Sequence, residues 1–153
     1  MEIVDVTFNF EQLEEIIVNK RKDCDEVCVQ IADIMMLYDE LDKIDPDLEM
    51  CMMERLALGQ SLIEVTENLR KASKKLVDSI NIYIAFMGAR IRYIENGKTE
   101  DQIMSDYKAR NERLELRRKI KKYENLRVDH QQAIDGLISE IEREEDMGTE
   151  RGE

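Results

Sequence analysis

Residues 80–94 read Ile-Asn-Ile-Tyr-Ile-Ala-Phe-Met-Gly-Ala-Arg-Ile-Arg-Tyr-Ile, the most apolar and aromatic run of this 153-residue chain. The apolar side chains are not confined to one helical stripe, so a helix of this sequence needs neighbours on several sides. The alternation over residues 80–84 leaves a β-strand as an alternative. Because residues 66–77 lead into the run with helical periodicity, we expect a helix.

The composition around this run favours long helices. Charged residues make up 38% of the chain, which contains a single Pro and six Gly. Such a composition, combined with sustained heptad repeats, is typical of helical bundles and coiled coils. We therefore predict an all-α fold with a single helical domain over residues 1–153, built as an elongated antiparallel three-helix bundle or coiled coil with a two-helix tip.

Turn signals divide the chain into three predicted helices. Asp45-Pro46-Asp47 separates the first two, because Pro suits the first helical turn. Asn96-Gly97 ends the second, and Thr99 with Gln102 forms a capping box that opens the third. The predicted elements are an extended lead-in (1–8), three helices (9–44, 46–96 and 99–146) and a frayed tail (147–153).

Heptad repeats assign the predicted core. The first seam contains Phe10, Ile17, Cys24, Ile31 and Tyr38, with Leu13, Lys20, Val27, Ile34 and Leu41 at the other core position. The second seam contains Met52, Gly59, Thr66, Ser73, Ile80, Met87 and Ile94, flanked by Leu62, Leu69, Leu76 and Tyr83 and widened by Leu56, Ile63, Val77, Ile84 and Ile91. The seam of the third helix changes register between Leu114 and Leu116.

An exposed apolar tip follows from antiparallel pairing of these helices. Short links place the start of the first helix opposite residue 80, and residue 80 opposite the register change near residue 115. Beyond this level only two helices remain, which leaves apolar surface for another polypeptide. Cover by the lead-in, or a bend in the second helix, is the alternative. The predicted partner-binding residues are Ile80, Ile82, Tyr83, Ile84, Phe86, Met87, Ile91, Tyr93, Ile94, Ile103, Met104 and Tyr107.

The sequence indicates a binding protein and not an enzyme. It has one His and no glycine-rich phosphate loop, and we predict no catalytic residues and no cofactor. We expect an adaptor, assembly factor or secretion chaperone whose partner is a second copy or a helix of another protein. The net charge of −12 argues against membrane surfaces and nucleic acid as partners. An acidic inhibitor that mimics nucleic acid is the alternative function.

A basic cluster and a group of two Cys and one His each have two interpretations, a functional site or an ordinary structural role. The basic residues Arg113, Arg117, Arg118, Lys119, Lys121 and Lys122 are predicted to lie near Glu11, Glu14 and Glu15, which favours a solvated face over a nucleic-acid patch. Cys24 and Cys28 lie one helical turn apart and level with His130, as a zinc site would require, or they are core residues. Three cysteines without a secretory signal favour free thiols and a cytoplasmic protein.

A family resemblance is carried by the hairpin of the first two helices. Val4-Asp5-Val6-Thr7-Phe8, followed by a second arm with Ile63-Glu64-Val65-Thr66-Glu67-Asn68-Leu69-Arg70 and Ile82-Tyr83, resembles the helical-hairpin proteins of type VII secretion, namely the WXG100 family and the partners of LXG toxins. The resemblance covers residues 3–94. It implies side-by-side pairing, a role as export partner or targeting chaperone, and leaderless export. The chain has no Trp and reads Asp45-Pro46-Asp47-Leu48 at the turn, so no family residue is assigned.

Overall fold

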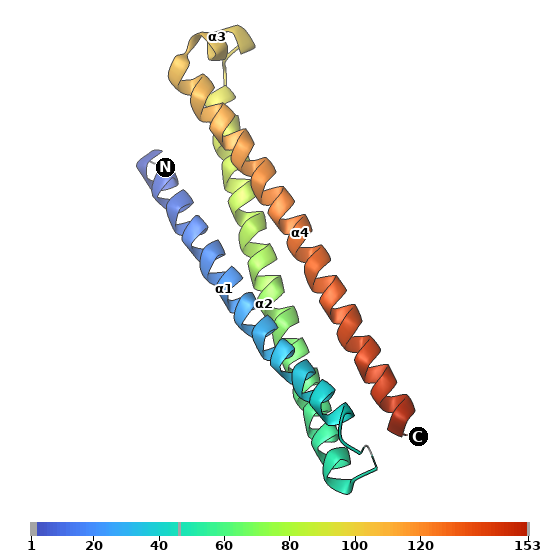
Figure 1. Cartoon of the computed structure of the whole chain (residues 1–153). Helices are drawn as coiled ribbons and strands as arrows, with labels where there is room; N and C mark the ends of the chain where they lie inside the picture. Colours follow the sequence, from blue (N-terminus) through green and yellow to red (C-terminus); the bar gives the residue numbers. More distant parts are fainter. Residues whose placement is uncertain (1–2, 46, 153) are drawn as a thin grey trace. The chain divides into compact units, whose positions relative to one another are not determined.

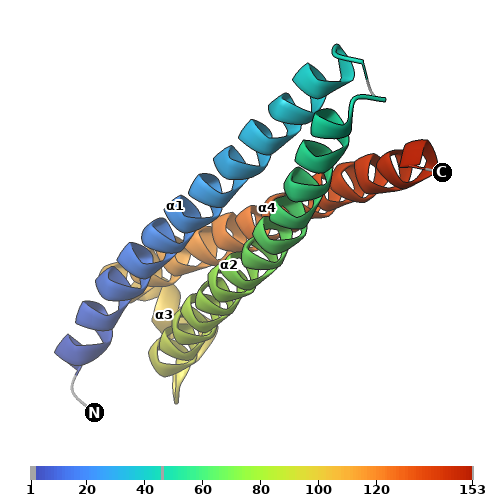
Figure 2. The same ribbon diagram turned by 90° about the horizontal axis from the view of Figure 1, so that it is seen from below.

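The protein is all-α, with three long helices packed antiparallel and one short helix (Figure 1). The computed structural model describes the backbone of residues 3–45 and 47–152 and the side chains of residues 10–45 and 47–143. The long helices are α1 (Ile3–Asp42), α2 (Glu49–Glu95) and α4 (Tyr107–Gly152), and the short helix α3 (Glu100–Ser105) comes between α2 and α4 in the chain, at the end where α2 finishes (Figure 2). No helix in the described ranges combines the length and apolarity needed to cross a membrane.

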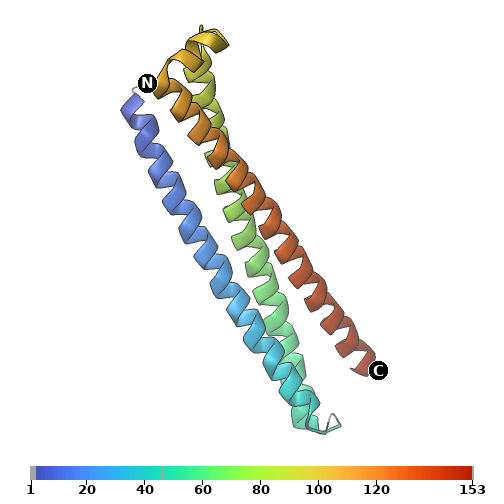
Figure 3. The ribbon, with the colours of Figure 1, turned by 45° about the horizontal axis from the view of Figure 1, so that its top comes forward.

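The structure corrects three predicted boundaries. The lead-in is not extended from Ile3 onwards, because α1 begins there and its backbone is helical. The third predicted helix is two helices, interrupted at Asp106, whose backbone is extended (φ −90°, ψ 102°). The predicted frayed tail is helical as far as Gly152, where α4 ends. The link between α1 and α2, at the lower end of Figure 3, lies where the Asp45-Pro46-Asp47 signal predicts it.

Each long helix contributes one segment to each of two compact units. Unit 1 contains Met1–Asn19 and Leu76–Gln131, and unit 2 contains Lys20–Lys75 and Gln132–Glu153. Each unit therefore has its own three-helix core.

The core of unit 2 is a cluster of aliphatic side chains from α1, α2 and α4. Its buried members are Ile31, Leu62, Leu69, Ile134 and Ile141. Gly59 leaves room for the Tyr38 side chain of α1, because a Cβ built on Gly59 would lie 3.0 Å from the Tyr38 hydroxyl. The same hydroxyl donates a hydrogen bond to the backbone carbonyl of Arg55 (3.2 Å), which ties the end of α1 to the start of α2.

The core of unit 1 is centred on Tyr83 of α2. Its ring makes edge contacts with the ring of Phe10 from α1 (centroids 6.0 Å apart) and the ring of Tyr123 from α4 (4.8 Å). Its hydroxyl donates to the Glu14 carboxylate, and Lys119 Nζ lies 3.2 Å from the same carboxylate oxygen. The level of residue 83 is therefore enclosed by three helices, where the sequence predicts the tip to have begun.

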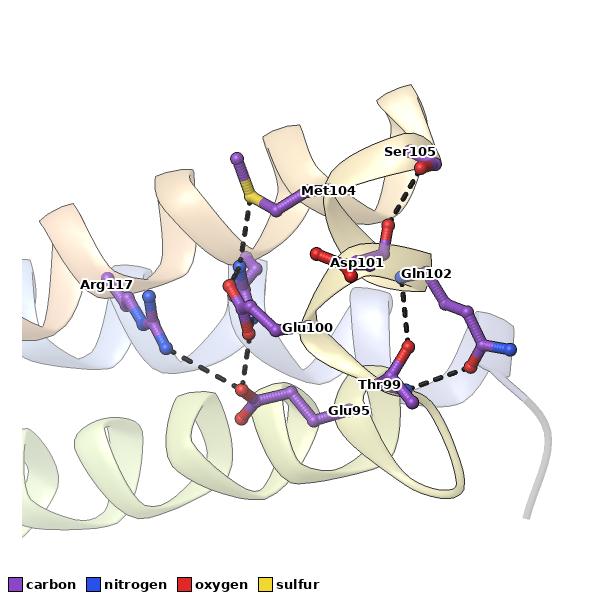
Figure 4. A network of polar contacts seen from close by, with 9 residues as sticks. Glu95, Thr99, Glu100, Asp101, Gln102, Met104, Ser105 and Arg117 are labelled. Atoms are coloured by element: carbon purple, nitrogen blue, oxygen red, sulfur yellow. Dashed lines mark hydrogen bonds and ion pairs between the residues drawn. The ribbon is translucent and has the colours of Figure 1, made fainter.

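An arginine-centred network closes the corner between α2, α3 and α4 (Figure 4). The buried Arg113 of α4 donates in a bidentate manner to the Glu100 carboxylate (2.7 and 2.9 Å) and reaches Glu95 Oε2 at 3.2 Å. The hydrogen bonds from Arg113 hold the pKa of Glu100 below its usual range. Arg117 Nη2 lies 3.6 Å from the same Glu95 oxygen. A planar guanidinium suits this convergence of carboxylates from two different helices.

Side-chain caps begin both α3 and α4 at this corner. The predicted capping box is present: Gln102 N–H donates to Thr99 Oγ1, and Thr99 N–H donates to Gln102 Oε1 (Figure 4). Asp106 caps α4, because its Oδ1 accepts from the backbone N–H groups of Lys108 (3.1 Å) and Ala109 (3.2 Å). Ser or Asp side chains at this position satisfy the free N–H groups of a helix start.

Candidate partner-binding surface

Half of the predicted partner-binding residues are buried within the chain itself. They occupy core positions of the α2 heptad or, in one case, the inner face of α3: Ile80, Tyr83, Met87, Ile91, Ile94 and Ile103. Ile84 is half-buried. The prediction that these side chains form an exposed tip is wrong. The Phe10 ring of α1 contacts Tyr83, and α1 begins seven residues before Phe10, at Ile3. About 10 Å of α1 therefore lies N-terminal to this contact, where the prediction had no first helix.

Three other predicted residues are exposed on a single face of α2. Ile82, Phe86 and Tyr93 are 48%, 38% and 58% exposed. Ala85 and Ala89 between them are also exposed. On a helix these positions lie on the side away from the buried positions 80, 83 and 87. The outward face of α2 is therefore apolar over residues 82–93, a length of roughly 17 Å.

This outward face has the spacing of a coiled-coil seam. Ile82, Phe86, Ala89 and Tyr93 follow one another at intervals of four, three and four residues, as alternating d and a positions do. We call these four residues the outer seam. A helix with such a seam normally packs it against another helix. Within unit 1, however, α2 already makes its contacts with α1 and α4 through its opposite side, as the rings around Tyr83 show.

The charged neighbours of the outer seam leave its apolar face accessible. Arg90 lies beside the seam with its guanidinium 4.9 Å from the Tyr93 ring centroid, and its Nε is 2.7 Å from Glu112 Oε1. The neighbouring Arg92 is exposed. A cation over the Tyr93 ring stabilises one orientation of that ring. The Tyr93 ring of the seam is thus held in place by Arg90.

The remaining two predicted residues belong to the corner at α3. Met104 is exposed, and its Sδ lies 3.6 Å from Arg113 Nη2. Tyr107 is exposed at the start of α4, with the Arg110 guanidinium 5.4 Å from its ring centroid. Both side chains therefore have arginine neighbours of their own, and neither extends the heptad spacing of the outer seam.

The basic cluster of α4 is partly neutralised within unit 1; the predicted neighbour Glu14 is found for Lys119, but Arg113 is buried with Glu95 and Glu100 and does not lie on the predicted solvated face. Burial alone would raise the pKa of Glu14, but the bonds from Tyr83 and Lys119 outweigh it and hold the pKa below its ordinary value. Glu14 is thus paired within unit 1, which reduces the negative charge that it offers to a partner.

The cysteines lie where core residues are expected. Cys24 and Cys51 are buried, Cys28 is half-buried, and all three are free thiols. Burial raises the pKa of Cys24 to about 11 and also raises that of Cys28, so neither is a thiolate at neutral pH. Within the residues that the structure describes, no group of three His, Cys, Asp or Glu side chains is arranged to hold a metal ion, including Cys24 and Cys28 with His130.

A second apolar surface lies at the end of unit 2 that joins α1 to α2. Eight large apolar side chains between residues 36 and 56 are between 47% and 73% exposed: Met36, Leu37, Ile44, Leu48, Met50, Met52, Met53 and Leu56. The heptad pattern places Met52 and Leu56 in or beside the second seam, and Ile63 with them, but all three are exposed. The density of methionines in residues 50–53 is the sequence signal that would have identified this surface.

Comparisons with known protein-family models, with curated proteins and with solved structures find no match to this chain. The resemblance to the helical-hairpin proteins of type VII secretion therefore stays a prediction.

Proposed function

We propose that this chain is a non-enzymatic helical interaction protein that pairs with a second copy of itself through the outer seam. The observation that carries the proposal is the coiled-coil spacing of Ile82, Phe86, Ala89 and Tyr93 on a face of α2 that no other described helix of unit 1 covers. Apolar side chains gathered on one exposed helix face indicate a surface that another protein covers.

The outer seam is complementary to itself when two copies lie antiparallel. A two-fold axis level with Met87 and Gly88 would place Phe86 of one copy opposite Ala89 of the other, and Ile82 opposite Tyr93. Each large side chain then faces a small or flat one, as interdigitating layers require. Contacts related by a two-fold axis close the assembly at a dimer. Side-by-side pairing is also what the resemblance to the WXG100 family implies.

The charges beside the seam permit this arrangement. In an antiparallel pair the exposed Arg92 of one copy would lie near Ala85 of the other, so like charges are not brought together. A seam of four side chains buries less than the ~800 Å² per partner of a stable interface. We therefore expect a dimer with a dissociation constant of about 1 μM or weaker.

Light scattering after size-exclusion chromatography tests the proposal with the variant Phe86→Glu. The wild type should rise from its monomer mass of 18.0 kDa toward twice that value as concentration increases. Phe86→Glu should remain monomeric, since a charge in the seam would be buried without a partner. The control Val128→Glu, at an exposed apolar position on α4, should behave as the wild type. Equal masses for the wild type and Phe86→Glu at every concentration would count against the proposal.

A further inference from the structure

The exposed end of unit 2 has a composition different from that of the outer seam. We call residues 36–45 and 47–56 the methionine end; they belong to the last turns of α1, the link and the first turns of α2. Besides its eight exposed apolar side chains, the methionine end carries seven acidic residues against two basic ones. The acidic residues are Asp39, Glu40, Asp42, Asp45, Asp47, Glu49 and Glu54, and all of them are exposed.

The exposed side chains project from a segment whose backbone is held by internal contacts. Leu41 and Cys51 are buried on either side of the link. The Tyr38 hydroxyl binds the Arg55 carbonyl, and the Arg55 guanidinium pairs with Asp42. In the link, the Asp47 N–H donates to Asp45 Oδ1 at 3.0 Å. The apolar side chains are therefore exposed on an anchored helical corner.

One flank of α2 continues this apolar surface. Met52, Leu56 and Ile63 are spaced at four and seven residues, so they lie on one face of the helix over roughly 17 Å. All three are more than half exposed. A stripe of this length matches three turns of a helix laid against it, which would present apolar side chains at i, i+4, i+7 and i+11.

The two features together specify the chemistry of a partner. Methionine side chains are flexible and polarizable, so a surface rich in them adapts to apolar side chains of different shapes. One of the two basic residues, Arg55, is paired with Asp42, so six acids of the methionine end remain against one further basic residue, Lys43. We propose that the methionine end binds a basic amphipathic helix of another protein, with its apolar face on the methionines and its Lys or Arg side chains beside the acids.

The charge disfavours the other occupants of this surface. A second copy of the methionine end would bring seven acids against seven, and like charges across an interface reduce affinity. Nucleic acid and anionic membranes present negative charge themselves. The proposal concerns a surface of unit 2 and does not depend on pairing through the outer seam of unit 1.

A designed peptide tests the proposal directly. The probe is a fluorescently labelled 18-residue helix of Leu and Lys with the Leu residues on one face, titrated with the full chain and followed by anisotropy. Two further peptides separate the contributions: a scrambled sequence of the same composition, which loses the apolar face, and a version with Glu in place of Lys. We expect saturable binding of the first peptide alone, weakening as salt is raised.

Variants of the protein locate the binding. Met53→Gln combined with Leu56→Gln should weaken binding of the Leu-Lys peptide by about tenfold or more, since apolar anchors dominate such contacts. Glu49→Gln combined with Glu54→Gln should weaken it by about threefold or more and reduce its salt dependence. Val18→Gln combined with Val29→Gln, at exposed apolar positions elsewhere on α1, should change it by less than about twofold.

Several results would overturn the proposal. The first is that the Leu-Lys peptide does not bind at all, and the second is that the scrambled or Glu-containing peptide binds as tightly as the Leu-Lys peptide. The third is that the Val18/Val29 control weakens binding as much as the Met53/Leu56 variant does. Self-association of the wild type that is abolished by the Met53/Leu56 variant would show that a second copy occupies the surface instead. Phe86→Glu should bind the peptide as the wild type does, so failure of the seam pairing and failure of this proposal can be told apart.

Discussion

Replacing Tyr83 with alanine is expected to lower the free energy of unfolding by about 3–5 kcal/mol. The Tyr83 side chain is 1% exposed and packs between the rings of Phe10 and Tyr123, so its removal leaves a cavity among three helices of unit 1. Urea unfolding followed by circular dichroism at 222 nm measures the change.

Tyr83→Phe separates the contribution of the ring from that of the hydroxyl, and Tyr107→Ala serves as a surface control. Burial raises the pKa of Tyr83, so the phenol stays protonated and donates to Glu14. Tyr83→Phe should therefore lose only that hydrogen bond, about 1 kcal/mol, because Glu14 keeps its pairing with Lys119. Tyr107→Ala removes an aromatic ring that is 71% exposed, and its effect should stay within about 0.5 kcal/mol. A loss at Tyr107 as large as that at Tyr83 would contradict the core assigned to unit 1.

Leu69→Ala is the corresponding test of unit 2, with an expected loss of about 2.5–5 kcal/mol in the free energy of unfolding. Leu69 is fully buried in the cluster with Ile31, Leu62, Ile134 and Ile141. The range reflects how far the neighbouring side chains can move into the space that the leucine leaves. Urea unfolding at several wavelengths would also show whether the two units unfold together.

A matched control lies two turns earlier on the same helix. Ile63 belongs to the same predicted seam but is 61% exposed. Ile63→Ala should change the free energy of unfolding by no more than about 0.5 kcal/mol, since alanine favours helices and little apolar surface is lost. If Ile63→Ala were as destabilising as Leu69→Ala, the assignment of Leu69 to the buried face of α2 and of Ile63 to its exposed face would be wrong.

The helical core could be predicted from the sequence because its heptads are long. The buried residues Ile17, Cys24 and Ile31 of α1, and Leu62, Leu69, Leu76, Ile80, Tyr83 and Met87 of α2, all stand at predicted seam positions. Heptad spacing sustained over this many residues predicts both that the segment is an α-helix and which of its faces is buried. The capping box at Thr99 and the turn at Asp45 are likewise short patterns with one dominant interpretation.

The errors arose where a short pattern competed with a longer one. Residues 1–8 were predicted as an extended lead-in, in which Val4, Val6 and Phe8 alternate with Asp5 and Thr7, but α1 begins at Ile3. Ser105-Asp106 contains a helix cap that a continuous heptad conceals, and Asp106 therefore starts α4. Each error changes which helices run alongside residues 80–94, and so the exposed tip was assigned to residues that lie in the core.

The sequence predicted that residues 80–94 contain the candidate surface, but it could not predict which of their side chains are exposed. Residues 80–94 are apolar on nearly all sides, and periodicity alone does not say which side meets α1 and α4. Once Tyr83 is placed against Phe10 and Tyr123, the far side of α2 follows from helical geometry, and Ile82, Phe86 and Tyr93 remain exposed. The methionine end was missed because Met52 and Leu56 also fit the heptad, and only their exposure separates surface from core.

The outer seam makes the pairing of two copies testable at the level of single contacts. Antiparallel pairing sets Phe86 of one copy against Ala89 of the other. Phe86→Ala leaves two alanines facing each other, Ala89→Phe brings two phenylalanines together, and the double exchange restores one large and one small side chain. None of these changes touches a buried residue, so the fold of each copy should be unaffected.

Sedimentation equilibrium of the wild type, Phe86→Ala, Ala89→Phe and the double exchange is the most direct measurement. We expect each single variant to weaken self-association by about fivefold or more, and the double exchange to return it to within about twofold of the wild type. Four proteins that remain monomeric, or a double exchange as weak as the two single changes combined, would contradict pairing through the outer seam.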